Sequence, residues 1–100
     1  MVTLINKFTV KADVDATRFE KVWLETSDFM RAQPGFLSYR FSKSATDPNV
    51  YVNVAEWEDS DAHRQVVTSD SFREHVTKLA ELATAQPEIF VPVFEGAPIA

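Results

Sequence analysis

Hydrophobic and polar residues alternate along the first ten positions of the chain. From Val2 to Val10, one side of the alternation is apolar except for Asn6, and the other side mixes polar and apolar residues. A period of two with many β-branched residues is typical of a strand. Similar patterns predict strands over residues 36–43 and 50–58, and a short apolar run predicts a fourth strand over 89–94.

The stretch after Asp15 repeats its apolar residues every three or four positions, which is the spacing of an amphipathic helix. Asp15 is a favourable N-cap residue, and the stripe includes Phe19 and Trp23. We expect this helix to continue to about Gln33, because the Pro-Gly pair that follows ends helices.

A second helical region begins after the third strand, with Asp59 or Ser60 as its cap, and breaks at residues 68–70. Ser71 and Glu74 have the spacing of a capping box for the second piece. The apolar stripe of that piece extends to Ala83, and the Gln-Pro pair at 86–87 is expected to end it.

The resulting βαββαβ order predicts a ferredoxin-like α+β fold, with a four-stranded antiparallel sheet and two helices on one face. We expect one domain over residues 1–95 and a C-terminal tail over 96–100. The third and fourth predicted strands are apolar on both sides. A bare apolar sheet face marks an interface, so the sequence predicts a homodimer that packs the two bare sheet faces against each other.

Composition narrows the classes of function. The chain has 100 residues, a net charge of −5 and no cysteine, and its Lys and Arg residues are scattered singly. Neither nucleic acid nor a membrane is therefore an expected partner, and thiolate chemistry is excluded. With no signal-peptide pattern visible, we expect a cytoplasmic location.

Asn6 and two histidines are the polar residues on otherwise apolar patterns. A buried amide is costly unless it is hydrogen-bonded, so Asn6 either bonds to a backbone group or water or holds a polar ligand atom. His75 lies one turn from Phe72, and His63 borders the short helix. Each histidine is either a structural residue or a general base, and His75 is also a candidate axial ligand to haem iron.

Aromatic residues are frequent enough to line a cavity between helices and sheet, and such a cavity suits a flat, largely apolar ligand. The aromatic residues expected there include Phe19, Trp23, Trp57 and Phe72. With only two glycines, the chain has no glycine-rich phosphate loop, and it has no Gly-x-Ser-x-Gly elbow. Nucleotide, phosphoryl and hydrolase chemistry are therefore poorly supported.

Two short motifs resemble the antibiotic biosynthesis monooxygenase family. They are the Pro-Gly-Phe turn at 34–36 and the Ala-Glu-Trp-Glu end of the third strand at 55–58. The resemblance covers residues 2–95. It implies a dimeric α+β barrel with a pocket between helices and sheet in each subunit.

The resemblance implies two possible activities. Quinone-forming members oxidise aromatic polyketides with O₂ and no metal or organic cofactor, and pocket Asn and Trp residues are implicated in positioning the substrate. Haem-degrading members of the IsdG type bind haem through a His of the second helical region, together with an Asn in strand one and a Trp. Asn6 and His75 match two of these positions, but Val66 stands where the haem enzymes keep the Trp.

We therefore expect first a cofactor-independent monooxygenase that uses O₂ on a small aromatic, polyketide- or quinol-like substrate. Asn6 and His75 are the expected catalytic residues, with His63 as an alternative base. A haem-binding or haem-degrading enzyme with His75 as iron ligand is the second hypothesis, and a non-catalytic small-molecule-binding dimeric barrel is the third. The expected substrate-binding residues are Phe19, Trp23, Trp57, His63, Val66 and Phe72.

Overall fold

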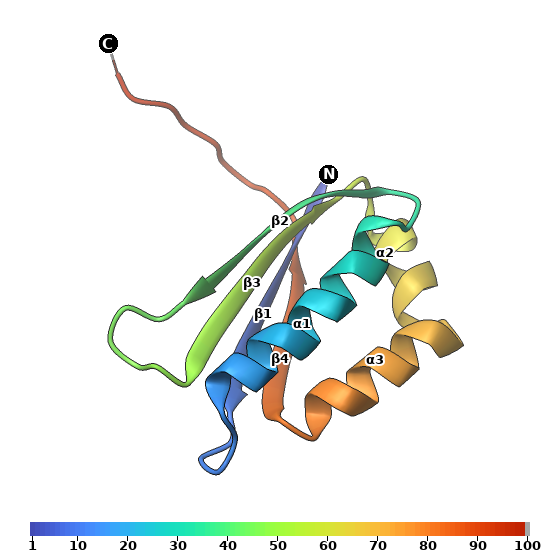
Figure 1. Cartoon of the computed structure of the whole chain (residues 1–100). Coiled ribbons are helices and arrows are strands. Elements are labelled where there is room, and N and C mark those ends of the chain that lie inside the picture. Colours follow the sequence, from blue (N-terminus) through green and yellow to red (C-terminus); the bar gives the residue numbers. More distant parts are fainter. Residues whose placement is uncertain (100) are drawn as a thin grey trace.

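The computed structural model describes residues 1–99, which form one antiparallel sheet with helices on one of its faces (Figure 1). The strand order is β2-β3-β1-β4. This arrangement confirms the predicted ferredoxin-like α+β fold, with the second helical region divided into two helices. The elements are β1 (Val2–Val10), α1 (Ala16–Arg31), β2 (Phe36–Lys43), β3 (Val50–Trp57), α2 (Ser60–Val67), α3 (Asp70–Ala80) and β4 (Ala83–Phe90).

The inner face of the sheet, which the helices cover, carries two separate hydrophobic clusters. In the central pair of strands, Leu4 lies opposite Ala55 and Phe8 lies opposite Tyr51. The first cluster gathers Leu4, Ala55 and their neighbours around Trp57, and the second gathers Phe8 and Tyr51 around Phe19. Asn6 and Asn53 lie opposite each other between the two clusters. The hydrophobic core is therefore interrupted by polar side chains at mid-strand.

The aromatic cluster around Phe19 ties α1 to β2 and β3. The Phe19 ring is fully buried and lies 5.2 Å from the ring of Tyr51, and Trp23 stacks on Phe41 with ring centroids 3.8 Å apart. The Tyr51 hydroxyl donates a hydrogen bond to Glu20 of α1 at 2.5 Å. Burial, reinforced by this acidic partner, raises the pKa of Tyr51. These contacts fix α1 against the sheet.

Side-chain caps begin each helix. The Asp15 carboxylate accepts the N–H of Thr17, and the Asp59 carboxylate accepts the N–H of Ala62 at 2.8 Å. Both predicted caps are confirmed. The predicted cap at Ser71 is wrong, because the Ser69 hydroxyl accepts the N–H of Phe72 and α3 already begins at Asp70.

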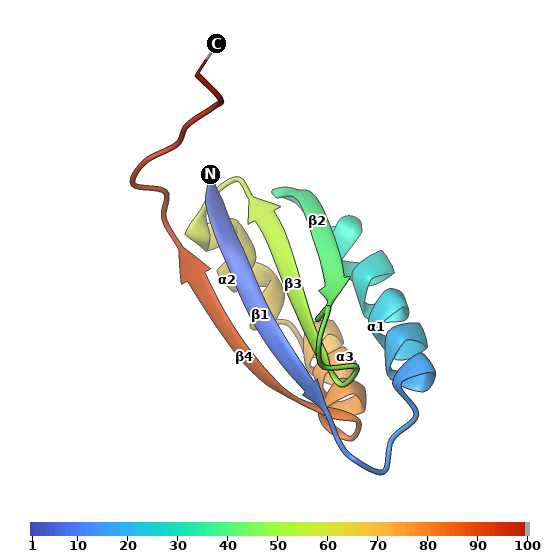
Figure 2. The same cartoon turned by 90° about the vertical axis from the view of Figure 1, so that its left-hand side faces the viewer.

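The fourth strand was predicted too late in the chain. Strand β4 begins at Ala83, because α3 ends at Ala80 and Ala83 pairs with Val10 of β1. Pro87 lies inside β4, and it is tolerated there because β4 is an edge strand. Residues 91–99 form no helix or strand and extend away from the sheet (Figures 1 and 2). Residue 100 of the expected tail lies outside the described residues.

The outer face of the sheet is apolar only at its centre. Ile5, Val52 and Val54 point to this face and are half-buried, as the pattern of β3 predicted. The expectation that the fourth strand is apolar on both sides is wrong. The true register of β4 places Thr84, Gln86 and Glu88 on the outer face, followed by Phe90.

Among the described residues, no helix combines the length and the apolar character needed to cross a membrane.

Gly35 joins the start of β2 to the start of α2. Its φ angle is +85°, and a Cβ atom placed on it would lie 2.5 Å from the Cβ of Ala62. The N–H of Glu58 donates to the Gly35 carbonyl at 2.8 Å. Only glycine meets both requirements, a left-handed backbone and a close approach to α2.

We expect Gly35→Ala to lower the free energy of unfolding by about 2–4 kcal/mol, because it combines backbone strain with overpacking against Ala62. Gly96→Ala is the matched control, since a Cβ there meets no atom within 4 Å. Urea unfolding of the two variants measures the difference. Equal stability of the two would show that the turn relaxes without cost.

Candidate functional site

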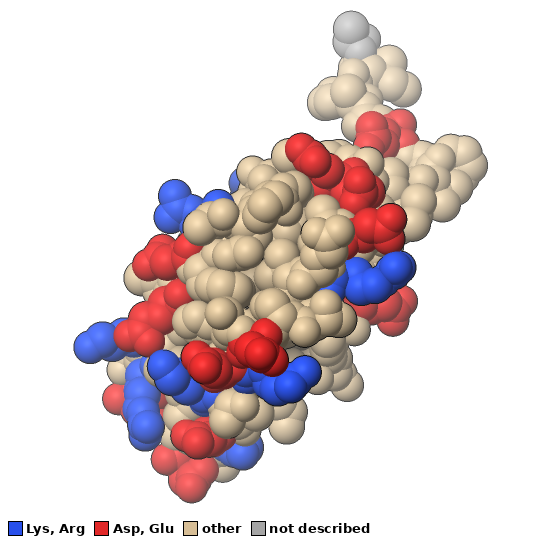
Figure 3. Space-filling model, turned by 90° about the vertical axis from the view of Figure 1, so that its right-hand side faces the viewer, with Lys and Arg blue, Asp and Glu red and all other residues tan. Residues whose placement is uncertain are grey.

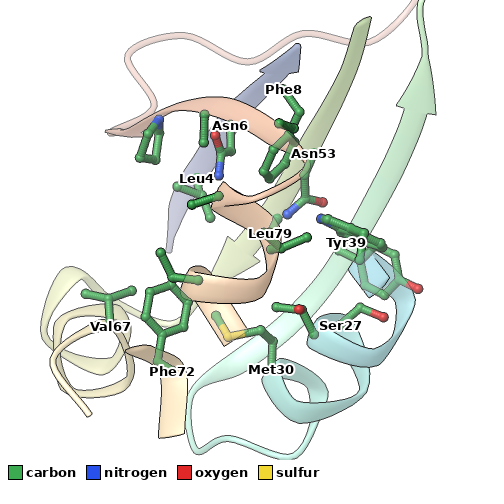
Figure 4. A pocket seen from close by; sticks show the side chains of 18 of the residues that line it. Leu4, Asn6, Phe8, Ser27, Met30, Tyr39, Asn53, Val67, Phe72 and Leu79 are labelled. Carbon is green, nitrogen blue, oxygen red and sulfur yellow. The ribbon is translucent and has the colours of Figure 1, made fainter. Parts of the chain in front are cut away.

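A cavity of about 630 Å³ lies between the inner face of the sheet and the helices (Figure 4). This volume is within the range of small-molecule sites in proteins. Most of the side chains that line it are apolar, among them Leu4, Phe8 and Leu79. None of the lining side chains is a carboxylate, although the chain has a net charge of −5. The cavity therefore suits a ligand that is largely apolar and not cationic.

The cavity opens beside β4 and α3. Ala85 and Pro87 belong to the inner face of β4 and line the cavity, yet both are exposed. Val76 of α3, another lining residue, is 40% exposed. Seen from the side of α2 and α3, the molecule shows a central uncharged area with acidic and basic side chains around it (Figure 3). The exposed side chains of Val76, Ala85 and Pro87 therefore make this side of the cavity apolar.

Asn6 and Asn53 place two amides on the floor of the cavity. They are register partners on β1 and β3, and both side chains reach into the cavity (Figure 4). The Oδ1 atom of each is buried and has no hydrogen-bond partner among residues 1–99. A buried polar atom left unpaired costs about 1–3 kcal/mol. Because the fold keeps two such atoms at paired positions of adjacent strands, a polar ligand group is the natural partner for them.

Trp57 and His63 form one end of the cavity. Trp57 is fully buried, and its Nε1–H has no acceptor within the described part of the chain. The His63 ring meets the Trp57 ring edge-on, with centroids 5.5 Å apart. Burial lowers the pKa of His63 below its ordinary value, because the charged form loses hydration. The site therefore holds a free N–H donor beside an imidazole that is neutral at pH 7.

The wall opposite the sheet adds two hydroxyls from α1. The Ser27 hydroxyl donates to the Leu24 carbonyl at 2.7 Å, and the Thr26 hydroxyl donates to the Val22 carbonyl at 3.2 Å. Their protons are thus used within the helix, while both residues line the cavity. The lone pairs that remain can accept hydrogen bonds from a ligand.

The structure brings together most of the residues proposed from the sequence, but not all. Those that line the cavity are Asn6, Trp23, Trp57, His63 and Phe72. Phe19 and Val66 are buried in the two hydrophobic clusters and do not line it. Both are apolar residues of helical stripes, and such a stripe does not distinguish packing from cavity lining.

His75 also lies apart from the cavity lining. Its ring stacks on Phe29 of α1, with centroids 4.9 Å apart and an angle of 30° between the planes. An axial haem ligand must face the space that the porphyrin occupies, so this placement does not fit haem ligation by His75. Within residues 1–99, no three His, Asp or Glu side chains gather as they would around a metal ion.

Asn53 is a residue of the cavity floor that is not among the candidates predicted from the sequence. It belongs to the same side of its strand as Tyr51, Ala55 and Trp57. An isolated polar residue on an otherwise apolar strand face is the sequence signal that could have identified it. Asn6 carries the same signal. What the sequence does not give is the register that places the two opposite each other.

Comparisons with known proteins agree with this geometry. The sequence profile of the family described as antibiotic biosynthesis monooxygenase matches residues 1–78. A deoxynogalonate monooxygenase from Streptomyces nogalater is 36% identical over 89 residues, which is 89% of this chain and 74% of that protein.

Solved structures match along almost the whole chain. The crystal structure of SnoaB from Streptomyces nogalater, described as a cofactor-independent oxygenase, superposes with a TM-score of 0.88 at 34% identity and covers 94% of both chains. A protein from Deinococcus radiodurans described as a putative antibiotic biosynthesis monooxygenase has a TM-score of 0.83 at 17% identity, covering 100% of this chain and 99% of the other. At that identity the second likeness shows the fold alone.

We expect Asn53→Leu to raise the free energy of unfolding by about 1–2 kcal/mol, because an apolar side chain of similar shape replaces an unpaired amide. Chemical denaturation measures the change, with Asn49→Leu in the β2–β3 turn as the control. A loss of stability in Asn53→Leu would mean that the amide is already well hydrogen-bonded in solution.

Proposed function

The chain belongs to the antibiotic biosynthesis monooxygenase family, and we propose that it is a cofactor-independent monooxygenase that uses O₂ on a small aromatic substrate. The observation that carries this proposal is the cavity whose buried polar groups lack protein partners: Asn6, Asn53 and Trp57. A module without a ligand would be expected to fill this space with its own side chains. Buried unpaired groups around an open volume instead favour the interpretation that a ligand with matching polar atoms binds there.

The substrate class follows from the lining. A flat ring system fills apolar space, and its phenolic hydroxyls donate to the two amide oxygens, while a ring carbonyl accepts the Trp57 N–H. An anthrone-type compound has these features, since it carries a carbonyl and phenols around a reactive methylene. The description of the SnoaB relative as cofactor-independent supports a reaction that needs no bound metal or organic group.

The proposed reaction uses O₂ as its only oxidant. The methylene loses a proton, and the electron pair stays on the substrate as a carbanion stabilised by the carbonyl. Transfer of one electron to O₂ and recombination of the two radicals give a peroxide at that carbon. Loss of the second C–H proton with cleavage of the O–O bond leaves a new C=O group and releases water. Both electron pairs come from the substrate, so no reductant is required.

We expect purified protein to consume one O₂ per anthrone and to form anthraquinone. The rate of O₂ uptake should not fall when a metal chelator is present. Asn53→Ala should lower kcat/KM by about ten- to a hundred-fold, the effect of losing one hydrogen bond in a dry site. An oxygen electrode and the quinone absorbance measure the two quantities.

Asn49→Ala is the matched control, because Asn49 precedes β3 and does not line the cavity. Its kcat/KM should equal that of the unmodified protein. Failure of the unmodified protein to exceed the spontaneous rate with hydroxylated or unsubstituted anthrones would remove this proposal.

The proposed enzyme is a homodimer that buries the apolar centre of the outer sheet face. Ile5, Val52 and Val54 form a continuous apolar row on the two central strands, and no helix within residues 1–99 covers them. A sheet with one uncovered apolar face is stabilised when a second sheet packs on it. The dimer would close the barrel that the family resemblance implied.

Sedimentation should therefore give twice the mass of one chain, and Val54→Asp should shift the protein to monomer because a carboxylate would be buried at the interface. Leu24→Asp is the control, since Leu24 is 53% exposed on α1, away from the outer sheet face. If Val54→Asp and Leu24→Asp sediment with the same mass, this interface is not the one that forms the dimer.

A further inference from the structure

One end of the cavity combines a hydrogen-bond donor with a proton acceptor. The Trp57 ring is fully buried with a free Nε1–H, and the His63 ring meets it edge-on at 5.5 Å and 75°. Both residues line the cavity. A carbonyl that accepts the Trp57 N–H would thus lie beside the His63 imidazole.

His63 has no competing partner in the part of the chain that the structure describes. Side chains around α2 make hydrogen bonds from or to Asp59, Thr68 and Ser69, and Asp61 forms an ion pair with Arg64. Among residues 1–99, the His63 ring enters neither kind of contact. Its nitrogens are therefore available to a ligand, and the half-buried ring is neutral at pH 7 because burial disfavours its charged form.

We infer that His63 is the general base that removes the proton from the substrate carbon, while the Trp57 N–H holds the carbonyl oxygen that receives the negative charge. This inference rests on the proposed oxygenation. In the step, the C–H bond breaks, the proton moves to an imidazole nitrogen of His63, and the electron pair becomes an enolate. The Trp57 donor stabilises that oxygen in a site shielded from water.

The short link between β3 and α2 positions this pair. Trp57 is the last residue of β3, and α2 begins three residues later, so a short link holds the two rings together. Gly35 contacts the same link through its carbonyl and through the close approach to Ala62, the residue before His63. The imidazole therefore has little freedom to leave the end of the cavity.

The charged groups on the elements packed against α2 leave this assignment intact. On β3 and its link, Glu56 accepts a hydrogen bond from Thr3 on the outer face, and Glu58 lies beside Gly35. On α3, Asp70 pairs with Arg73, and both are exposed, as is Glu74. The pKa of His63 is lowered by burial alone, without a contribution from any of these groups.

His75 provides an internal comparison. It is the second of the two histidines, it is half-buried like His63, and its ring also contacts an aromatic ring, that of Phe29. It differs in that it does not line the cavity. If both histidines have only a structural role, substituting either one should affect turnover to a similar extent. If His63 is the base, only its substitution should lower turnover.

The test is proton exchange of anthrone in D₂O without O₂, followed by NMR of the methylene group. We expect the protein to accelerate exchange, and His63→Phe to reduce the enzymatic acceleration by about a hundred-fold or more, the usual contribution of a positioned base. His75→Phe should retain it. Quenching of tryptophan fluorescence by anthraquinone serves as the binding control and should give similar Kd values for the three proteins.

The pH dependence gives a second readout that packing alone would not change. With His63 present, kcat/KM for O₂ uptake should fall as the pH drops through the lowered pKa, because the protonated imidazole cannot accept a proton. This limb should disappear in His63→Phe and remain in His75→Phe. Free imidazole should partly restore exchange in His63→Gly.

The outcomes separate the two proposals. Undiminished exchange in His63→Phe, or O₂ uptake by the unmodified protein without any enzymatic exchange, overturns the role of His63 and leaves the oxygenase proposal standing. Absence of both O₂ uptake and exchange in the unmodified protein overturns both proposals. Loss of exchange together with loss of anthraquinone binding in His63→Phe would show a binding role and also overturn the base assignment.

Discussion

The pair of asparagines at the middle of the two central strands is the constraint on which the rest of this structure depends. Asn6 and Asn53 lie opposite each other on the face that the helices cover, where the neighbouring positions are hydrophobic. The Oδ1 atom of each is buried and unpaired among residues 1–99, at a cost of about 1–3 kcal/mol each, and continuous packing across them would leave no room for a ligand to pair with these atoms. The core instead divides into two clusters, and a cavity of about 630 Å³ remains between helices and sheet.

The two clusters give this cavity rigid walls. Aromatic contacts of Phe19 and Trp23 hold α1 on the sheet at one end, and Trp57 packs against Phe36 and His63 at the other. An oxygenase without a cofactor requires little more than this: a dry space, donors and acceptors in fixed positions, and a base. The stability lost at the unpaired groups is, in this account, the cost of a site prepared for its ligand.

Sequence patterns predicted the fold better than the site. Alternation predicts β1 to β3 within one residue, because side chains of these strands keep a period of two along their length. It misplaces β4, because Pro87 resembles a break and is tolerated only since β4 is an edge strand. Periodicity could not separate His75, which packs on Phe29, from His63, which lines the cavity. Asn53 was missed because only the strand register shows that it faces Asn6.

The NMR signal of the Trp57 indole N–H during titration with anthraquinone tests directly whether the unpaired polar groups of the cavity bind a ligand. The chain has two tryptophans, so Trp23→Phe assigns the two indole resonances. If the unpaired polar groups exist to hold a ligand, the Trp57 resonance should move downfield and saturate as its N–H bonds to the quinone carbonyl. Saturable binding that leaves this resonance unmoved would show that the Trp57 N–H does not hold the ligand.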